Sequence, residues 1–302
     1  LCRDCGYVHT CQRCDAPLIQ HFGSDDLDVT ELVAPRASVL ICHHCGRRYP
    51  PPDACPRCRG RRIRYFGAGT QRIEAEVKAM LPGVRTLRWD RDATGPRGAH
   101  EQILDRFMRR EADILIGTQM VAKGLDLPWV TLVGVIAADT GLFLPDFRAA
   151  ERTFQLLTQV VGRAGRTPRG GRAIIQTYNP QVYPIQAAAQ HDFGEFYQRE
   201  IAFRREHAYP PYRRLARLLT RGRDERTIRH EAKAIAQRLQ VELNRRGESR
   251  SALIGPAPCF FARVRCQYRW HLILRAVDPV AILRDFSLPR NWWIDVDPIS
   301  LL

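Results

Sequence analysis

Eight of the ten cysteines fall into four C-x-x-C units near the start of the chain. The units are Cys2/Cys5, Cys11/Cys14, Cys42/Cys45 and Cys55/Cys58. Two thiolates at this spacing in a tight turn can both reach one metal ion, and two such turns complete a tetrahedral shell with sulfurs at roughly 2.3 Å. Eight ligands therefore predict two zinc ions (Zn2+). A disulfide scaffold is the weaker interpretation, because nothing marks the chain as secreted and C-x-x-C is a poor geometry for a structural bridge. A redox role suits one such unit but not four.

The spacing of the units favours a nested pairing. Five residues separate the first two units, 27 the second and third, and nine the third and fourth. The long gap can go out and back as a hairpin, with strands at 18–22 and 38–41. The inner ion would then be held by Cys11, Cys14, Cys42 and Cys45, and the outer ion by Cys2, Cys5, Cys55 and Cys58. A sequential pairing, which needs the five-residue link to fold back sharply, is the second interpretation.

Both ions are expected to be structural, because four sulfurs close each shell and leave no position for a water molecule. A region of about sixty residues, 1–62, is too small and polar to be held by burial alone, so metal binding would supply much of its folding free energy. The histidines in "CHHC", His43 and His44, are not expected to be ligands. Cys259 and Cys266 lack a partner at metal spacing and are expected to be buried thiols.

The charge of the chain limits the choice of partner. Its 302 residues carry a formal net charge of +15, with a pI of about 9.8. Such an excess indicates nucleic acid first and an anionic membrane surface second. No apolar run approaches the ~20 residues of a membrane span, and no signal peptide is visible. The chain begins at Leu1 rather than Met, so we expect an N-terminal part of the protein to precede it.

The middle of the chain alternates helical and strand patterns, which predicts a parallel sheet with right-handed crossovers. Helices are expected at 70–81, 98–112, 147–166 and 193–207, and strands at 84–89, 113–118, 130–138 and 172–178. The first helix would carry Ile73, Val77, Met80 and Leu81 on one face, and the second would point Ile103, Leu104, Phe107 and Met108 inward. The strands at 113–118 and 130–138 read as buried runs. Ligands of such sheets bind at the carboxyl ends of the strands.

Two polar segments are expected at that edge of the sheet. In "QVVGRAGR", Gln159, Arg163 and Arg166 share one helix face. Arginines beside glycines at a helix end can act as arginine fingers, which neutralise charge on a transferring phosphoryl group. A solvated basic face is the alternative interpretation.

The other segment is "GTQMVAKGLD". Thr118 ends a strand where a hydroxyl can contact a phosphate, and Lys123 and Gly124 would follow the same backbone. Asp126 could accept a ribose hydroxyl or orient an arginine. Taken singly, Lys123 is an ordinary surface lysine and Asp126 an ordinary helix cap.

The four C-x-x-C units, "GTQRIE", "GTQMVAKGLDLPWVTLVGVIAAD", "DFRAAERTFQLLTQVVGRAGR" and "YPPYRRLARL" together resemble the C-terminal half of the primosomal protein N′ family, bacterial replication-restart helicases of superfamily 2. The resemblance covers essentially the whole chain. It implies an α/β fold, in which a two-zinc ribbon module with four cysteines at each ion is inserted into the second RecA-like lobe, 63–207, and a C-terminal α+β domain follows, 208–302. The nested zinc pairing is also the family's.

The resemblance also implies roles for the two polar segments. The first in chain order would be helicase motif V, with Thr118, Gln119 and Lys123 on nucleic acid and Gly124 and Asp126 at the nucleotide. The second would be motif VI, with Gln159, Arg163 and Arg166 facing the ATP phosphates. The implied activity is ATP-dependent 3′→5′ DNA unwinding in the bacterial cytoplasm, associated with the nucleoid. The implied partners are branched forks and single-stranded DNA, the single-stranded DNA-binding protein and other primosome proteins, with no membrane.

One departure bears on mechanism. The chain has no G-x-x-x-x-G-K-[ST] phosphate loop and no D-E-x-H metal motif. "DERT" at Asp224 reads as a charged helix start. ATP and Mg2+ would need a first lobe that this sequence does not contain, so we expect no hydrolysis from the chain alone. A non-catalytic zinc-ribbon scaffold that binds nucleic acid is the alternative function, but it leaves the two polar segments without a task.

The end of the chain reads as a small α+β domain. After the prolines of "YPPY" we expect strands at 213–221, 251–258, 260–277 and 292–298, with helices at 225–247 and 279–286. Alternation within the third strand would place Arg263 and Arg265 on one face. Tyr268 and Trp270 could stack on single-stranded bases or fill the core between sheet and helix.

Overall fold

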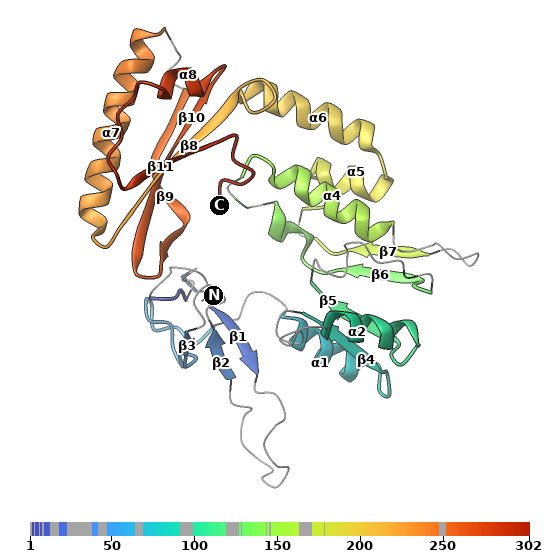
Figure 1. Ribbon diagram of the computed structural model, residues 1–302. Helices are drawn as coiled ribbons and strands as arrows, with labels where there is room; N and C mark the ends of the chain where they lie inside the picture. Colours follow the sequence, from blue (N-terminus) through green and yellow to red (C-terminus); the bar gives the residue numbers. More distant parts are fainter. Residues whose placement is uncertain are drawn as a thin grey trace.

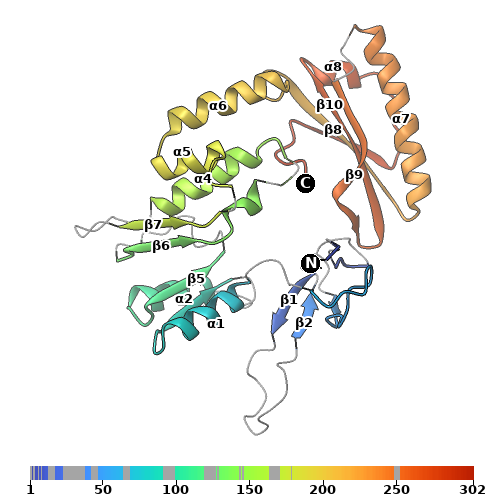
Figure 2. The same cartoon turned by 180° about the vertical axis from the view of Figure 1, so that it is seen from behind.

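The computed structural model describes residues 2, 4–5, 7, 9–12, 18–22, 38–41, 47–63, 69–90, 99–118, 127, 129–142, 144, 146–162, 171–177, 179–247 and 252–302. Figure 1 shows three groups of elements: short strands near the N-terminus, an α/β region in the middle of the chain, and a sheet with one long helix at the end. The same grouping is seen from behind in Figure 2. The three groups follow one another along the sequence.

The N-terminal group is a small antiparallel sheet. Its strands β1 (Ile19–Phe22), β2 (Ser38–Ile41) and β3 (Arg48–Tyr49) pair in the order β1-β2-β3. β1 and β2 pair from Ile19↔Ile41 to Phe22↔Ser38. This is the hairpin that the long gap between cysteine units predicts, with the expected strand positions.

The middle region contains two pairs of parallel strands among the described residues. β4 (Thr86–Trp89) pairs with β5 (Ile114–Gly117), and β6 (Leu132–Val135) pairs with β7 (Arg172–Ile175). The helices are α1 (Thr70–Met80), α2 (Ala99–Met108), α4 (Ala149–Val161), α5 (Tyr183–Gln190) and α6 (Phe193–Glu206), with a 3-10 turn η1 (Ala138–Gly141) after β6. The predicted alternation and parallel pairing are confirmed, whereas α5 was not predicted.

Some of the predicted burial in this region is wrong. Met108, which was expected to point inward, is exposed, and the end of the apolar face of α1 is exposed as well, at Met80 and Leu81. β6 is not a buried run either, because Leu132 and Ile136 are exposed while Val135 packs towards α4. One face of β6 therefore packs against the core that includes α4. The opposite face, which carries Leu132 and Ile136, is exposed in the part of the chain that the structure describes.

The core of this region lies where α4 and α5 cover β6 and β7 and where α6 packs on these two helices (Figure 1). Its buried members are Ala138, Phe154, Leu157, Ile185, Ala187, Ala188 and Phe196. The rings of Phe154 and Phe196 stack with centroids 4.1 Å apart. Arg204 of α6 adds a polar tie, since its Nε donates to Glu200 and its Nη2 to Glu151 of α4, both at 2.6 Å. These contacts fix the helix that leads into "GRAGR".

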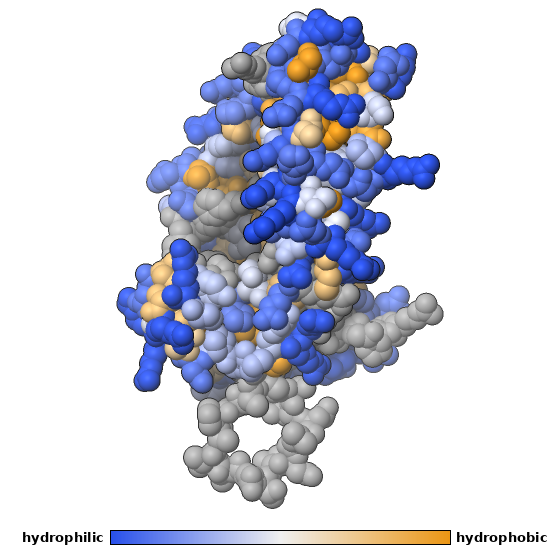
Figure 3. Space-filling model, turned by 90° about the vertical axis from the view of Figure 1, so that its left-hand side faces the viewer, coloured by the Kyte–Doolittle hydropathy of each residue, from blue (hydrophilic) through white to orange (hydrophobic). Residues whose placement is uncertain are grey.

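The C-terminal region is an antiparallel sheet covered by a helix. Strands β8 (Arg214–Gly222), β9 (Leu253–Val264), β10 (Gln267–Ala276) and β11 (Trp292–Val296) take the order β11-β8-β10-β9. α7 (Glu225–Arg245) buries Ile228, Ala232, Ile235, Leu239 and Leu243, a helical stripe, and α8 (Pro279–Leu283) adds Ile282 and Leu283 to the same core. The molecular side that carries α7 is mostly hydrophilic (Figure 3).

Asp224 caps α7, because its side chain accepts a hydrogen bond from the backbone N–H of Thr227 at 2.9 Å. The same carboxylate accepts from the Thr227 hydroxyl. "DERT" is therefore a helix start, as the sequence predicts, and not a metal motif.

The prediction for residues 251–277 is wrong in one respect. β9 and β10 form a hairpin that turns at Arg265 and Cys266, whose φ values are 50° and 62°. Arg263 and Arg265 therefore do not share one face of a single strand. Cys266 is exposed at the turn and not the expected buried thiol, whereas Cys259 is buried. Trp270 belongs to the core, which favours that interpretation over base stacking, and Tyr268 is half-buried.

A buried carboxylate joins the middle and C-terminal regions. The side chain of Asp146 is 0% exposed and lies just before α4. Its Oδ2 accepts hydrogen bonds from Nη1 of Arg152 at 2.9 Å, the hydroxyl of Ser300 at 3.0 Å and the backbone N–H of Leu301 at 3.2 Å. Its Oδ1 accepts from the N–H of Arg148 at 3.0 Å. We call these contacts the Asp146 clasp.

Apolar packing surrounds the clasp. Leu301 inserts beside Phe147, Leu215 and Ile273. Arg148 and Arg152 also donate to the carbonyl of Ile299. The segment after β11 is thus held by both regions at once, close to the C label in Figure 1.

The substitution Asp146→Asn tests the clasp. An amide matches the carboxylate in shape but not in charge, so we expect a loss of about 1–3 kcal/mol at the junction. Urea denaturation should show a lower midpoint, and trypsin should cut faster between α6 and β8. Asp105→Asn, which alters an exposed carboxylate on α2, is the control. Equal effects of the two changes would contradict a special role for Asp146.

His271 on β10 predicts a pH dependence of stability. Burial is the main cause that lowers its pKa to about 4, and the charges of Arg217 and Arg269 add to the effect. The unfolded chain takes up this proton near pH 6.5, so stability should fall as the pH drops from about 6.5 towards 4.

Thermal unfolding between about pH 6.5 and 5 measures this effect, since most carboxylates stay ionised there. His271→Gln should flatten the dependence of Tm on pH in this window, whereas His230→Gln, at an exposed position of α7, should not. An unchanged slope for His271→Gln would rule out this histidine as the cause.

Candidate functional site

The four outer cysteines meet in space. One sulfur from each of Cys2, Cys5, Cys55 and Cys58 lies within 4.8 Å of all the others. The Sγ atoms of Cys2 and Cys58 are 3.6 Å apart, as are those of Cys5 and Cys55. Sulfurs bound at ~2.3 Å in a tetrahedron lie roughly 3.8 Å apart, so the cluster has the dimensions of a four-sulfur metal shell.

Backbone hydrogen bonds shape the two turns that carry these sulfurs. The N–H of Cys2 donates to the carbonyl of Tyr7 at 2.8 Å. In the second turn the N–H of Cys55 donates to the carbonyl of Gly60, and the N–H of Arg59 donates back to Cys55, both at 2.9 Å. An isolated antiparallel bridge between Cys2 and Ile63 holds the two turns side by side.

Gly60 allows the turns to approach each other closely. A Cβ atom at this position would lie 2.3 Å from Oδ2 of Asp4 and 3.3 Å from the sulfur of Cys58. Asp4 is itself fixed, because its Oδ1 accepts a hydrogen bond from Nε of Arg62 at 2.6 Å. Any larger residue in place of Gly60 would therefore displace Asp4 and press on the sulfur of Cys58.

Within the cluster, the pKa of Cys55 lies below that of an ordinary thiol. Burial raises the pKa of Cys55, but hydrogen bonds from the backbone N–H groups of Cys58 and Arg57 outweigh it and bring the pKa to about 7. Metals bind thiolates rather than thiols. The backbone around Cys55 therefore lowers the pKa of one of the four thiols that would bind the metal.

Only Cys11 of the inner set lies within the described residues. It is fully buried, and its sulfur is 3.2 Å from the hydroxyl of Tyr49. Cys14, Cys42 and Cys45 lie outside the described residues, as do His43 and His44. The β1–β2 hairpin that should bring the inner units together is present, but the inner metal site stays a prediction.

Two of the predicted motif residues can be placed. Thr118 is exposed directly after β5, and Gln159 is exposed in the last turn of α4. Gln119, Lys123, Gly124, Asp126, Arg163 and Arg166 lie outside the described residues. Their roles at DNA or nucleotide therefore stay predictions.

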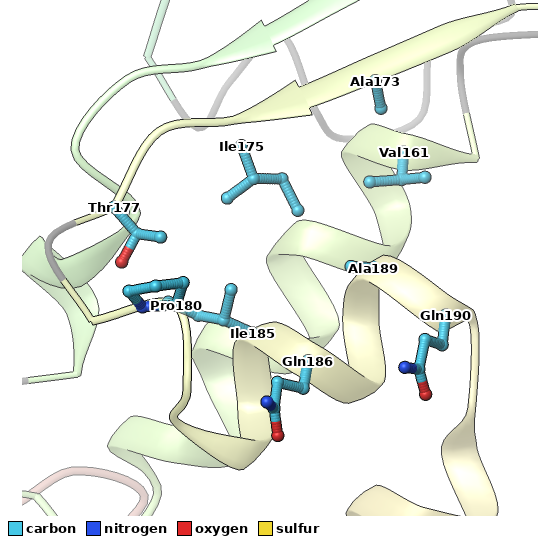
Figure 4. Close-up of a pocket in the computed structure, with 9 residues that line it drawn as sticks. All are labelled: Val161, Ala173, Ile175, Thr177, Pro180, Ile185, Gln186, Ala189 and Gln190. Carbon is cyan, nitrogen blue, oxygen red and sulfur yellow. The ribbon is translucent and has the colours of Figure 1, made fainter.

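A cavity of about 350 Å³ lies beside the end of α4 (Figure 4). Its lining comes from α4, from β7, from α5 and from the segment between β7 and α5. The lining residues are Val161, Ala173, Ile175, Thr177, Pro180, Ile185, Gln186, Ala189 and Gln190. No charged side chain is among these residues. Among the described residues, the lining of the cavity therefore offers hydroxyl and amide groups but no cation to pair with a phosphate.

Comparison with known proteins decides the family. Residues 56–168 match the helicase conserved C-terminal domain, and residues 205–299 match the primosomal protein N C-terminal domain. The replication restart protein PriA of Bacillus subtilis is 46% identical over 280 residues, which cover 91% of this chain and 32% of that protein. The chain belongs to the PriA family.

Two further PriA proteins match almost the full chain. The protein of Synechocystis sp. is 39% identical over 307 residues, 99% of this chain and 35% of the relative. The protein of Treponema pallidum is 40% identical over 312 residues, 100% of this chain and 44% of the relative. The chain thus spans less than half the length of these PriA proteins.

The helicase match gives the middle region its fold class, a RecA-like second lobe of superfamily 2 type within a mixed α/β chain. This agrees with the parallel pairs β4–β5 and β6–β7. The boundaries predicted after residues 62 and 207 are not tested by these matches. Among the described helices, none combines the length and the hydropathy that crossing a bilayer demands.

Sequence reasoning missed the residues that support the cysteines. Asp4 and Gly60 stand inside or beside C-x-x-C units, so their position was a usable signal. Tyr49 follows the third unit by four residues and gave no such signal. Its contact with Cys11 depends on the pairing of β2 with β3.

The outer cluster predicts the loss of one metal ion in Cys55→Ser. A hydroxyl is a poor substitute for a soft thiolate ligand, so elemental analysis of the purified variant should show about one equivalent less than the parent chain. Cys266→Ser, at the exposed turn of the β9–β10 hairpin, should keep the parent content. Equal metal content in the parent and Cys55→Ser would contradict the site.

Proposed function

We propose that this chain is the metal-binding and second-lobe part of an ATP-dependent 3′→5′ DNA helicase that restarts replication. The observation that supports this most strongly is the match of PriA proteins over 91–100% of the chain. Composition agrees with a nucleic-acid partner, since the net charge is +15.

We infer that the metal is zinc, with two ions in the chain. A tetrahedral set of four sulfurs suits Zn2+ or an iron centre, and repeated C-x-x-C pairs are typical of zinc ribbons. Cys2, Cys5, Cys55 and Cys58 would hold the outer ion. The inner ion would be held by Cys11, Cys14, Cys42 and Cys45. A closed shell of sulfur supplies structure rather than a reactive water.

The proposed ATPase site would be completed from another lobe. Arg163 and Arg166 follow α4, and their guanidinium groups would face the ATP phosphates and offset charge on the transferring phosphoryl group. Gln159, exposed on the last turn of α4, would lie at the same edge. The chain has no G-x-x-x-x-G-K-[ST] segment, so these arginines would serve a phosphate loop located elsewhere in the protein.

The motif V residues would pass lobe closure to DNA. Thr118, at the exposed end of β5, would contact a backbone phosphate together with Gln119 and Lys123. Gly124 and Asp126 would lie towards the nucleotide. The metal module would touch the displaced duplex, as a wedge does, or partner proteins.

The proposed partners are branched forks, single-stranded DNA, the single-stranded DNA-binding protein and other primosome proteins, all within the bacterial cytoplasm at the nucleoid. A zinc-ribbon scaffold without catalysis would share the charge and the cysteines. It would not need arginines after α4, and this difference separates the two functions by experiment.

Arg163→Ala or Arg166→Ala, made in the longer protein with its first lobe, should lower DNA-stimulated ATP turnover by roughly 10³-fold or more. DNA affinity should be little changed. Arg109→Ala, at an exposed position after α2, is the matched control and should turn over ATP normally. Normal turnover in both motif VI variants would exclude their assigned role and favour the scaffold.

A further inference from the structure

The β9–β10 hairpin of the C-terminal region contacts the cysteine module across the chain. Phe261 of β9 packs in one small cluster with Cys11, Leu18 and Tyr49. Figures 1 and 2 both show the turn of this hairpin beside the N-terminal strands. More than 200 residues separate the two partners in sequence, so neither is a local consequence of the other's fold.

A polar contact accompanies the apolar one. Nη1 of Arg263 donates a hydrogen bond to the backbone carbonyl of Gln12. Gln12 follows Cys11 directly in the sequence, so the guanidinium of Arg263 holds the backbone next to Cys11. The guanidinium also lies over the ring of Tyr268, 5.1 Å from its centroid, which holds it in this direction.

The charge at this turn suits an arginine. Cys11 is fully buried, and the hydroxyl of Tyr49 lies 3.2 Å from its sulfur. In the proposed inner site, four thiolates around one divalent ion would carry a net formal charge of about −2, and a nearby cation would lower the energy of that charge. Nε of Arg263 is buried and has no hydrogen-bond partner among the described residues. This N–H group is therefore available to interact with the negative charge of the proposed inner site.

We propose that the β9–β10 hairpin is a docking element for the cysteine module, and that Phe261 and Arg263 link the C-terminal domain to metal retention by that module. The proposal rests on the metal-binding function proposed above. Phe261 supplies the apolar contact, and Arg263 is a positioning residue that acts on the Cys11 turn. Because coupling is reciprocal, docking that strengthens metal retention implies that the metal strengthens docking by the same factor.

The consequence for the molecule is a second long-range connection of its C-terminal domain, in addition to the Asp146 clasp. The Asp146 clasp ties the C-terminal domain to α4, and the docked hairpin ties the same domain to the cysteine module. The module is thereby held by the C-terminal domain as well as by the chain that leads into α1. Loss of metal would release the hairpin and leave the clasp intact.

Release of metal to a chromogenic chelator tests the link. In Arg263→Gln of the intact protein we expect one of two metal equivalents to be released about tenfold faster, since one charge-assisted hydrogen bond is lost. Phe261→Ala should act in the same direction. Arg265→Gln, at the exposed turn two residues further on, is the control and should release metal at the parent rate. Arg263→Lys, which keeps the cation, should fall between the parent and Arg263→Gln, and this rescue separates a charge effect from general destabilisation.

Hydrogen exchange supplies the reciprocal measurement. Removing metal from the parent protein should raise amide exchange in residues 258–264 while the amide of Leu301, in the clasp, keeps its protection. Suppose that two metal equivalents bind, but that the release rate does not depend on Arg263 and amide exchange in the hairpin does not depend on metal. The proposed link between hairpin and metal would then be wrong, and the metal sites themselves would be unaffected. If the purified protein binds no metal in any state, both the link and the metal-binding proposal are overturned.

Discussion

The carboxylate of Asp146 is the contact on which the arrangement of the chain depends. It is fully buried, and one guanidinium, one hydroxyl and two backbone N–H groups converge on it from both sides of the domain junction. A buried charge without such partners would be costly. The two regions must therefore stay together for the charge to be tolerated, and Leu301 closes the junction with apolar surface.

The Asp146 clasp lies at the start of the helix whose far end leads to the proposed ATP-contacting arginines. It fixes the start of α4, where Glu151 adds a polar tie to Arg204 of α6, and the stacked contact of Phe154 with Phe196 fixes the middle of the helix. The far end of the same helix presents Gln159 and leads to the arginines proposed for ATP. The C-terminal domain is thus in contact with the element that would sense nucleotide, although the domain itself carries no phosphate-binding motif.

Sequence patterns predicted what depends on spacing or periodicity. The gap between cysteine units predicted the β1–β2 hairpin and the meeting of the outer sulfurs, and the helical pattern at 225–247 predicted α7. The turn at Arg265 and Cys266 was missed because two residues without turn propensity adopt positive φ while the alternation continues through them. Asp146 was missed because its partners Ser300 and Leu301 lie about 150 residues away, and no local pattern marks such a pair.

The two long-range contacts together decide which parts of the chain can move separately. The clasp joins α4 to the C-terminal domain, and the Phe261 and Arg263 contacts join that domain to the cysteine module. In the proposed helicase cycle, closure of the second lobe would carry the domain and the module with it, because each is packed on the next. A module held only by a flexible tether would lag behind the lobe and could not press on a duplex. Attachment through the hairpin would therefore give the proposed metal module the support that a wedge requires.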